Sequence, residues 1–469
     1  MSSVESKLAD ECAVQSTFLV DEAGVPDESL DELKEAVEHT KDIESGGTVD
    51  ETCENLSVAL AMFLLVVDVV GTGVLTIPNT FATLGWIPGH LTLLLCWGLS
   101  LCAGLLLWRL RHQKYKSGHS YPQLFFSAFG KKGLVFARFN TYPLLFLYTA
   151  AFSYTQAQAW SALFSGSAVS LTQWMIIAGF VSLVVLQLRS FKAMAFTSII
   201  AIVTIILPIG ISFFVIASMV KDPVAYPVGQ RVLFSYYGTS DCVIAAMDIL
   251  YAFAGAVVFL EIMSAMKLVK NFPYSLVISQ TFAYLFYATT GSAVYGLAGD
   301  ATWLVSPYTN SLQPGAAAIV ANVCVVIHVS IAIVIKGQIL IYGIQRAAEP
   351  FVKRLFLGND NAPYKVAKLT SLKPAAFLWW FLWALIVVVL ETLLNIAIPS
   401  FEIYLALISS LIASQTMMLW PAGIDIYAFG KERKGKKHLF TVLSGVIFML
   451  GLTALILGLY GGIVGIIQT

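Results

Sequence analysis

Two apolar stretches of the chain each carry a carboxylate a few residues before a run of small residues. In the first stretch, Asp68 precedes Gly71-Thr72-Gly73, and Pro78 follows. In the second stretch, Asp248 precedes the run Ala252 to Gly255. Glycine lets a backbone leave helical geometry or pack closely. A carboxylate at membrane depth costs about 2.5–3.5 kcal/mol, so each acid should face the protein interior or a cavity.

A helix that breaks in mid-membrane can bind a zwitterion. The break exposes free N–H groups at the start of one half and free C=O groups at the end of the other. The N–H ends can hold a carboxylate, and the C=O ends can hold an ammonium group. The alternative is that the small residues only allow helices to pack closely. The residues predicted to contact an amino-acid substrate are Thr72, Gly73, Val74, Ala252, Phe253 and Gly255.

The elements that must position these residues are eleven apolar segments of membrane-spanning length. They predict an all-α polytopic membrane protein. The two interrupted segments are the first and the sixth, so they enter the membrane from opposite sides, as inverted repeats do. The eleven segments run over residues 57–80, 87–108, 139–161, 171–188, 195–219, 242–266, 275–298, 316–343, 375–396, 401–420 and 438–464.

The distribution of positive charge predicts the orientation. With a cytosolic N-terminus, the cytosolic loops hold 22 Lys and Arg residues, whereas the opposite face holds Lys221 and Arg231. A missed or an invented span would destroy this asymmetry. Eleven spans then place the C-terminus on the non-cytosolic side. Topology also explains the basic loops, although they could in addition contact anionic lipid.

Composition supports a membrane protein with an acidic tail. Of the 469 residues, 58% are hydrophobic and 12% are charged, about half the charged share of a typical soluble domain. Sixteen of the 28 acidic residues lie within the first 54 positions. We predict a cytosolic tail over 1–55, disordered in preference to a short helix. The predicted transport core covers 56–437, with repeats at about 56–220 and 240–437, and residues 438–469 form the eleventh helix and a short C-terminus.

Several kinds of site are not indicated. The six cysteines have neither metal-site nor disulfide-framework spacing, so we expect no metal and no cofactor. The pattern GxxxxGK[ST] does not occur, which argues against ATP-driven transport. We expect no nucleic-acid partner. A membrane enzyme would need clustered His, Asp or Cys at one membrane face, and the sequence shows no such cluster.

The two interrupted segments and the eighth resemble motifs of the amino acid/auxin permease family. The resemblance runs from about Ser57 to the C-terminus. It implies the five-plus-five inverted repeat of LeuT-like transporters with broken helices 1 and 6, amino-acid or related substrates, and often proton coupling. The motifs are Gly71 to Pro78 with Phe81 and Leu84-Gly85-Trp86; Ala252 to Gly255 with Phe259 to Met263 and Phe272-Pro273; and Asn322, Ile327-His328, Gln338 and Glu349.

Charged groups inside the spans suggest the coupling ion. In this fold, as the resemblance implies, sodium can bind between carbonyls of helix 1 and oxygens of helix 8. Here helix 8 offers Ser330 as the hydroxyl in its middle and also carries Lys336, whose ammonium would repel sodium. We predict that Asp68, Lys336 and Glu261 take part in proton coupling. Lys336 could pair with Asp68 or Glu391, or extend to the cytosolic face.

His328 lies eight residues before Lys336, roughly on the same helix face. A buried structural pair involving these groups and Glu391, or a proton relay, would each explain the arrangement.

The predicted function is secondary active transport of amino acids, with proton-coupled symport by alternating access as the favoured mode. The alternatives are a sodium-coupled transporter, a transporter-like nutrient sensor and, more remotely, a channel or a polytopic membrane enzyme. The expected partners are an amino acid, a proton or sodium ion, and membrane lipid. The expected location is the plasma membrane or a vacuolar or endosomal membrane.

Overall fold

The computed structural model describes residues 56–189, 191–357, 374–398, 400–430 and 436–468. They belong to a compact unit that runs from Glu54 to Thr469. The tail predicted over 1–55 lies outside the described residues. Within the described part, the regular secondary structure is helical, and the one strand-like feature is an isolated bridge between Leu56 and Met266.

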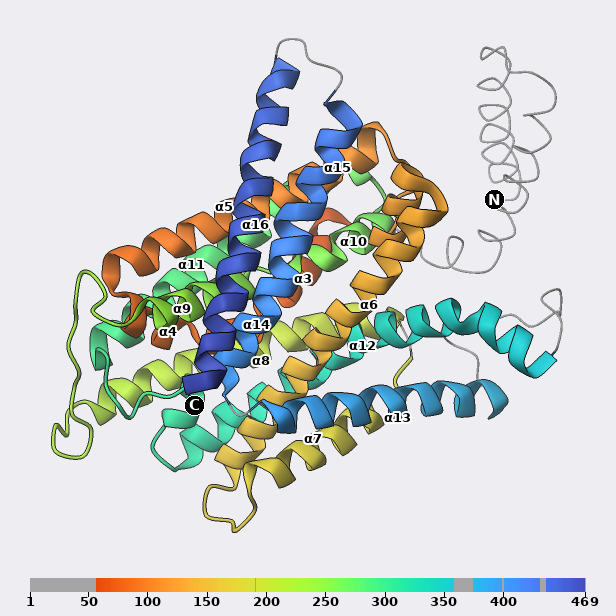
Figure 1. Ribbon diagram of the computed structural model, residues 1–469. Helices are drawn as coiled ribbons and strands as arrows, with labels where there is room; N and C mark the ends of the chain where they lie inside the picture. The colour runs from red at the N-terminus through yellow and green to blue at the C-terminus, as the bar shows by residue number, and fades with distance from the viewer. Residues whose placement is uncertain (1–55, 190, 358–373, 399, 431–435, 469) are drawn as a thin grey trace, which may run out of the picture. The chain divides into compact units, whose positions relative to one another are not determined.

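Most consecutive helices are joined by short connections, and a longer loop over residues 220–238 joins α8 to α9 (Figure 1). Their bounds are α3 Val58–Val69, η1 Thr72–Leu75, α4 Ile77–Leu84, α5 Trp86–Gln113, α6 Tyr121–Leu163, α7 Leu171–Val185, α8 Phe191–Met219, α9 Thr239–Ala252, η2 Gly255–Val258, α10 Phe259–Ala265, η3 Val269–Asn271, α11 Phe272–Ala298, η4 Tyr308–Ser311, α12 Ala316–Leu357, α13 Pro374–Ala397, α14 Phe401–Ala413, η5 Ser414–Leu419, α15 Trp420–Phe429 and α16 Lys436–Gln468.

Seven helical stretches of the described part are long and apolar enough to cross a membrane. They are Trp86–Gln113, Ile199–Met219, Thr239–Ala265, Ala316–Ala348, Ala376–Ala397, Phe401–Phe429 and Phe440–Ile467. The four other predicted spans fall on the α3–η1–α4 segment, α6, α7 and α11, so the count of eleven stays a prediction. Large apolar side chains are exposed on the peripheral helices, among them Leu393 on α13 and Ile467 on α16, where lipid would cover them.

The two segments with small residues are interrupted helices. The first helix, α3, ends at Val69, and the chain resumes helical geometry in η1 and α4 beyond Gly71. The second, α9, ends at Ala252 and continues as η2 and α10. Both interruptions fall where the small residues predict them.

The interrupted helices run antiparallel. At one end, the Leu56 N–H donates to the Ala265 carbonyl over 2.9 Å, and the Lys267 N–H donates to the Leu56 carbonyl over 3.1 Å. These bonds tie the start of α3 to the end of α10. At the other end, α4 packs against α9. The two breaks are thereby brought together.

Two long helices flank the breaks. The 42-residue α12 packs along α6 and α8, and the 43-residue α6 changes direction at Gly130, where φ is 65°. Only glycine adopts this left-handed conformation at little cost. These helices bring Tyr148 and Phe152 of α6, and His328 and Lys336 of α12, into the bundle interior.

Candidate functional site

Tyrosine hydroxyls satisfy the backbone carbonyls that the breaks release. A buried carbonyl without a partner is costly, most of all where no water is at hand. The Tyr287 hydroxyl of α11 lies 2.7 Å from the Val69 carbonyl and 3.0 Å from the Ala252 carbonyl, and can donate to either. The Tyr148 hydroxyl donates to the Ala254 carbonyl. Side chains from neighbouring helices therefore hold both breaks in place.

The two breaks approach each other so closely that glycine is needed at Gly73. A Cβ atom on Gly73 would lie 2.5 Å from the Cα of Ala252, which real structures do not tolerate. Beside this contact, Thr72 Oγ1 and the Tyr251 hydroxyl form a hydrogen bond of 3.1 Å. Residues from both breaks thus form one continuous wall.

An ion pair lines the same cavity as these residues and joins two helices. Lys336 Nζ of α12 lies 2.9 Å from Asp68 Oδ1 of α3, and the two side chains are 4% and 6% exposed. The ammonium also lies over the Tyr148 ring, 4.3 Å from its centroid, and 5.1 Å from that of Phe152. Such cation–π contacts strengthen when the cation is desolvated. Lys336 is therefore held in the interior and does not extend to the cytosolic face.

The second carboxylate oxygen of Asp68 is available for another ligand. Oδ2 is buried and has no hydrogen-bond partner among the described residues. It lies against the second break, where a Cβ atom on Gly255 would be 2.5 Å away from it. A proton or an ammonium group is the natural partner for a buried carboxylate oxygen.

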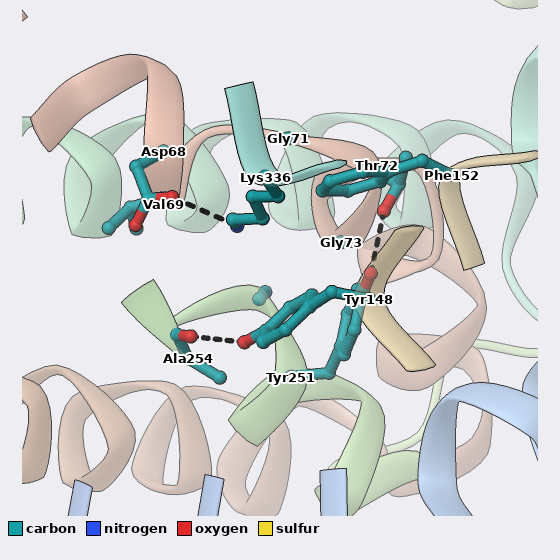
Figure 2. A pocket seen from close by; sticks show the side chains of 11 residues that line it. Asp68, Val69, Gly71, Thr72, Gly73, Tyr148, Phe152, Tyr251, Ala254 and Lys336 are labelled. Atoms are coloured by element: carbon teal, nitrogen blue, oxygen red, sulfur yellow. Dashed lines mark hydrogen bonds and ion pairs between the residues drawn. The ribbon is translucent and has the colours of Figure 1, made fainter. Parts of the chain in front are cut away.

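These groups surround a small cavity (Figure 2). Its free volume is about 10 Å³, close to the least that a single water molecule needs. This space is too small for an amino acid, and Lys336 is among the residues that line it. The lining residues are Asp68, Val69, Gly71, Thr72, Gly73, Tyr148, Phe152, Tyr251, Ala252, Ala254 and Lys336.

The fold and this site set the context for comparison with known proteins. A sequence profile of the family described as transmembrane amino acid transporter protein matches residues 54–464. The chain belongs to this family. It is also similar to the N amino acid transport system protein of Neurospora crassa, with 23% identity over 417 residues, which cover 85% of this chain and 83% of that protein.

This membership identifies an integral, multi-pass membrane transporter rather than an enzyme. The match begins within a few residues of α3, so the acidic tail stands outside it. The recognition of the family from its helix motifs is confirmed.

The cavity of the transporter contains part of the predicted substrate site. Thr72, Gly73 and Ala252 line it, together with Asp68 and Lys336. The other three predicted contacts, Val74, Phe253 and Gly255, are buried beside it without lining it. Their contact with substrate stays a prediction.

The other acids named from the sequence, Asp248, Glu391 and Glu261, lie outside the cavity lining. Glu391 of α13 accepts a hydrogen bond from Thr149, so it is Asp68 and not Glu391 that pairs with Lys336. Glu261 lies on α10 outside the cavity lining, near Arg111, which donates to the Leu260 carbonyl over 3.0 Å. The structure thus gives Glu261 no direct contact with the ion pair, and its part in coupling stays a prediction.

Sequence reasoning missed the four aromatic residues of the transporter's site. Tyr148, Phe152, Tyr251 and Tyr287 are all buried against the breaks, and none of them is among the residues that the sequence predicted for the site. A tyrosine in the middle of a span is a usable signal, because its hydroxyl must find a partner there.

Proposed function

We propose that the protein is a proton-coupled amino acid transporter that works by alternating access around the cavity between the two breaks. The observation that carries the proposal is the buried Asp68–Lys336 pair, which joins α3 to α12 at this cavity. The eleven-span, five-plus-five inverted repeat belongs to the same proposal. The antiparallel course of the two interrupted helices supports it.

Complementary charge supports a zwitterionic substrate. An amino acid would place its ammonium group at Asp68 Oδ2 and at the carbonyl ends of the broken helices. Its carboxylate would lie near the Lys336 ammonium and the N–H groups at the start of η1. Substrate and ion pair together then carry no net charge, which limits the cost of burial in the membrane.

Proton coupling follows from the dual role of Asp68. A proton on this carboxylate removes its negative charge and with it the attraction to Lys336. The inner half-helix α3 is then no longer tied to α12 and can move away to open the cytosolic path. Loss of the proton to the cytosol restores the ion pair and returns α3 to its closed position.

Sodium coupling is less favoured by the same groups. The Lys336 ammonium lies where α3 and α12 meet, and a fixed cation opposes a second one. Ser330, the hydroxyl in the middle of helix 8, donates to the Val326 carbonyl over 2.7 Å and accepts from Gln156 over 2.8 Å. The Ser330 hydroxyl is therefore already hydrogen-bonded within the protein.

The test is uptake of labelled amino acids into proteoliposomes, with pH and sodium gradients varied independently. We expect uptake driven by an inward proton gradient without sodium, and loss or uncoupling of transport in Asp68→Asn at normal protein yield. Uptake that requires sodium and ignores the proton gradient would overturn proton coupling.

We also propose a cytosolic N-terminus and a C-terminus on the opposite face. The distribution of 22 cationic loop residues against two supports this orientation. Cleavable tags at both ends should differ in protease access in intact cells. Equal access would mean that the span count is wrong.

A further inference from the structure

His328 of α12 is a buried group that the proposed transport cycle does not use. It is 1% exposed, and its Nδ1 lies 2.9 Å from the Ala201 carbonyl of α8. A carbonyl can only accept, so Nδ1 carries the hydrogen. In a neutral imidazole the other nitrogen, Nε2, is then a bare acceptor. Nε2 has no hydrogen-bond partner among the described residues.

This acceptor is aimed at the break in the first helix. A methyl group placed on Gly71 would lie 4.0 Å from His328 Nε2, and apart from the glycine's chain neighbours no other described atom would come within 4 Å of it. The side-chain face of Gly71 is therefore not in tight contact with another side chain, and the nearest described atom that faces it is the imidazole nitrogen. Gly71 itself lines the cavity with Asp68 and Lys336.

We propose that His328 selects the substrate side chain, accepting through Nε2 a hydrogen bond from a hydroxyl or carboxamide group. This inference rests on the proposed function, because it assumes an amino acid bound at the breaks. With the backbone groups of the substrate at Asp68 and Lys336, its side chain would lie on the face of Gly71 that meets His328, once the cavity widens to admit an amino acid. The substrates favoured are neutral and polar, of the threonine, asparagine and glutamine kind.

The charge of the site argues against the other side-chain classes. A carboxylate side chain would meet the lone pair of Nε2 and be repelled. A cationic side chain could donate, but it would add a second positive charge near Lys336. An apolar side chain would cover Nε2 and leave a buried acceptor unpaired, which costs free energy.

Two substitutions distinguish the role of the acceptor atom Nε2 from that of Nδ1, which is bonded to the Ala201 carbonyl. In His328→Asn the amide nitrogen can still donate to the Ala201 carbonyl, while the group at Nε2 is lost. His328→Gln returns an amide oxygen to about the position of Nε2. The substrates are matched pairs of similar size, threonine with valine and glutamine with methionine, measured as uptake into proteoliposomes under a proton gradient.

We expect the unaltered protein to prefer threonine and glutamine by about tenfold, the effect of one unpaired buried acceptor. His328→Asn should reduce both ratios to near one through a higher KM for the polar member. Uptake of valine should not fall, because valine no longer leaves a buried acceptor unpaired, and uptake should still depend on the proton gradient. His328→Gln should restore at least part of the preference. Gly71→Ala, which narrows the space, should reduce uptake of glutamine and methionine together.

Transport that continues in His328→Asn with unchanged ratios would overturn the inference and leave the proposed function standing. An equal loss of uptake for all four amino acids would also overturn it, because His328 would then only support the fold. Absence of any amino acid uptake by the unaltered protein would overturn both proposals.

Discussion

Replacing one charged residue of the Asp68–Lys336 pair with a neutral one should destabilise the protein far more than replacing both. The two atoms lie 2.9 Å apart and are almost fully buried, so at an effective dielectric constant of about 20 their attraction is about 6 kcal/mol. Desolvation of both groups offsets much of this in the intact pair. Removing one partner leaves the other buried without a counter-charge, which typically costs about 3–5 kcal/mol.

The perturbation is a double-mutant cycle with Asp68→Asn and Lys336→Met. Asparagine keeps the shape of the carboxylate, and methionine keeps an apolar contact with the rings of Tyr148 and Phe152. We expect each single substitution to lower the stability of the detergent-purified protein by about 3 kcal/mol or more. The double substitution should regain most of that loss, because it leaves no lone charge. All three variants should lack proton-driven uptake.

The assays are denaturant or thermal unfolding in detergent, with equal lipid in every sample, and uptake into proteoliposomes at several external pH values. Glu391→Gln is the matched control, since Glu391 is equally buried but accepts its hydrogen bond from Thr149. A glutamine oxygen can keep that bond, so both stability and proton dependence should stay within error of the unaltered protein. Additive losses in the double variant would refute a coupled buried pair. Unchanged pH dependence in Asp68→Asn would refute the role of Asp68 in coupling.

Three further predictions concern other parts of the molecule. Gly73→Val should abolish uptake while leaving delivery to the membrane intact, because even a Cβ atom at this position would overlap the second break. The control is Gly98→Val, which should transport normally, because an added Cβ atom there meets no atom of another segment within 4 Å. Asp425→Ala should lower thermal stability by about 2–3 kcal/mol, since it leaves Arg109, 3.1 Å from the lost carboxylate, without its ion-pair partner; an unfolding measurement that shows no change would contradict this. Burial and a neighbouring arginine lower the pKa of His119 in the loop after α5. The unfolded chain therefore binds a proton at His119 more tightly than the folded protein does, and acidification below about pH 6.5 should destabilise the fold. In His119→Gln, the loss of stability between pH 7 and pH 5 should be smaller.

The sequence predicted those features of the fold and site that depend on the residues of one segment alone. Glycine and other small residues next to a membrane-depth acid predicted both interruptions, and the structure has them at Gly71 and Ala254. The cost of a charge in lipid predicted that Asp68 turns inward, whereas for Lys336 it left open a buried pair or an extension to the cytosolic face. Each of these inferences depends on the local chain and its solvent, and neither requires knowledge of which helices are neighbours.

The partners across helices could not be predicted in the same way. Asp68 and Glu391 were equal candidates to pair with Lys336, and only the packing of α12 against its neighbours decides between them. The hydroxyl of Tyr287 and the acceptor of His328 are similar cases. Their roles depend on a contact more than a hundred residues away along the chain, and hydrophobic periodicity does not encode such a contact.

Neighbouring helices supply hydrogen bonds to the backbone at both interruptions. Side-chain hydroxyls lie within hydrogen-bond reach of several carbonyls at the breaks, which lowers the cost of interrupting a helix in lipid. Tyr287 serves two such carbonyls, at Val69 of the first break and at Ala252 of the second. A hydroxyl has one hydrogen to donate, so it can satisfy one of these carbonyls at a time. The Val69 carbonyl also accepts from the Gly71 N–H over 2.8 Å, so it keeps a donor when Tyr287 donates to Ala252.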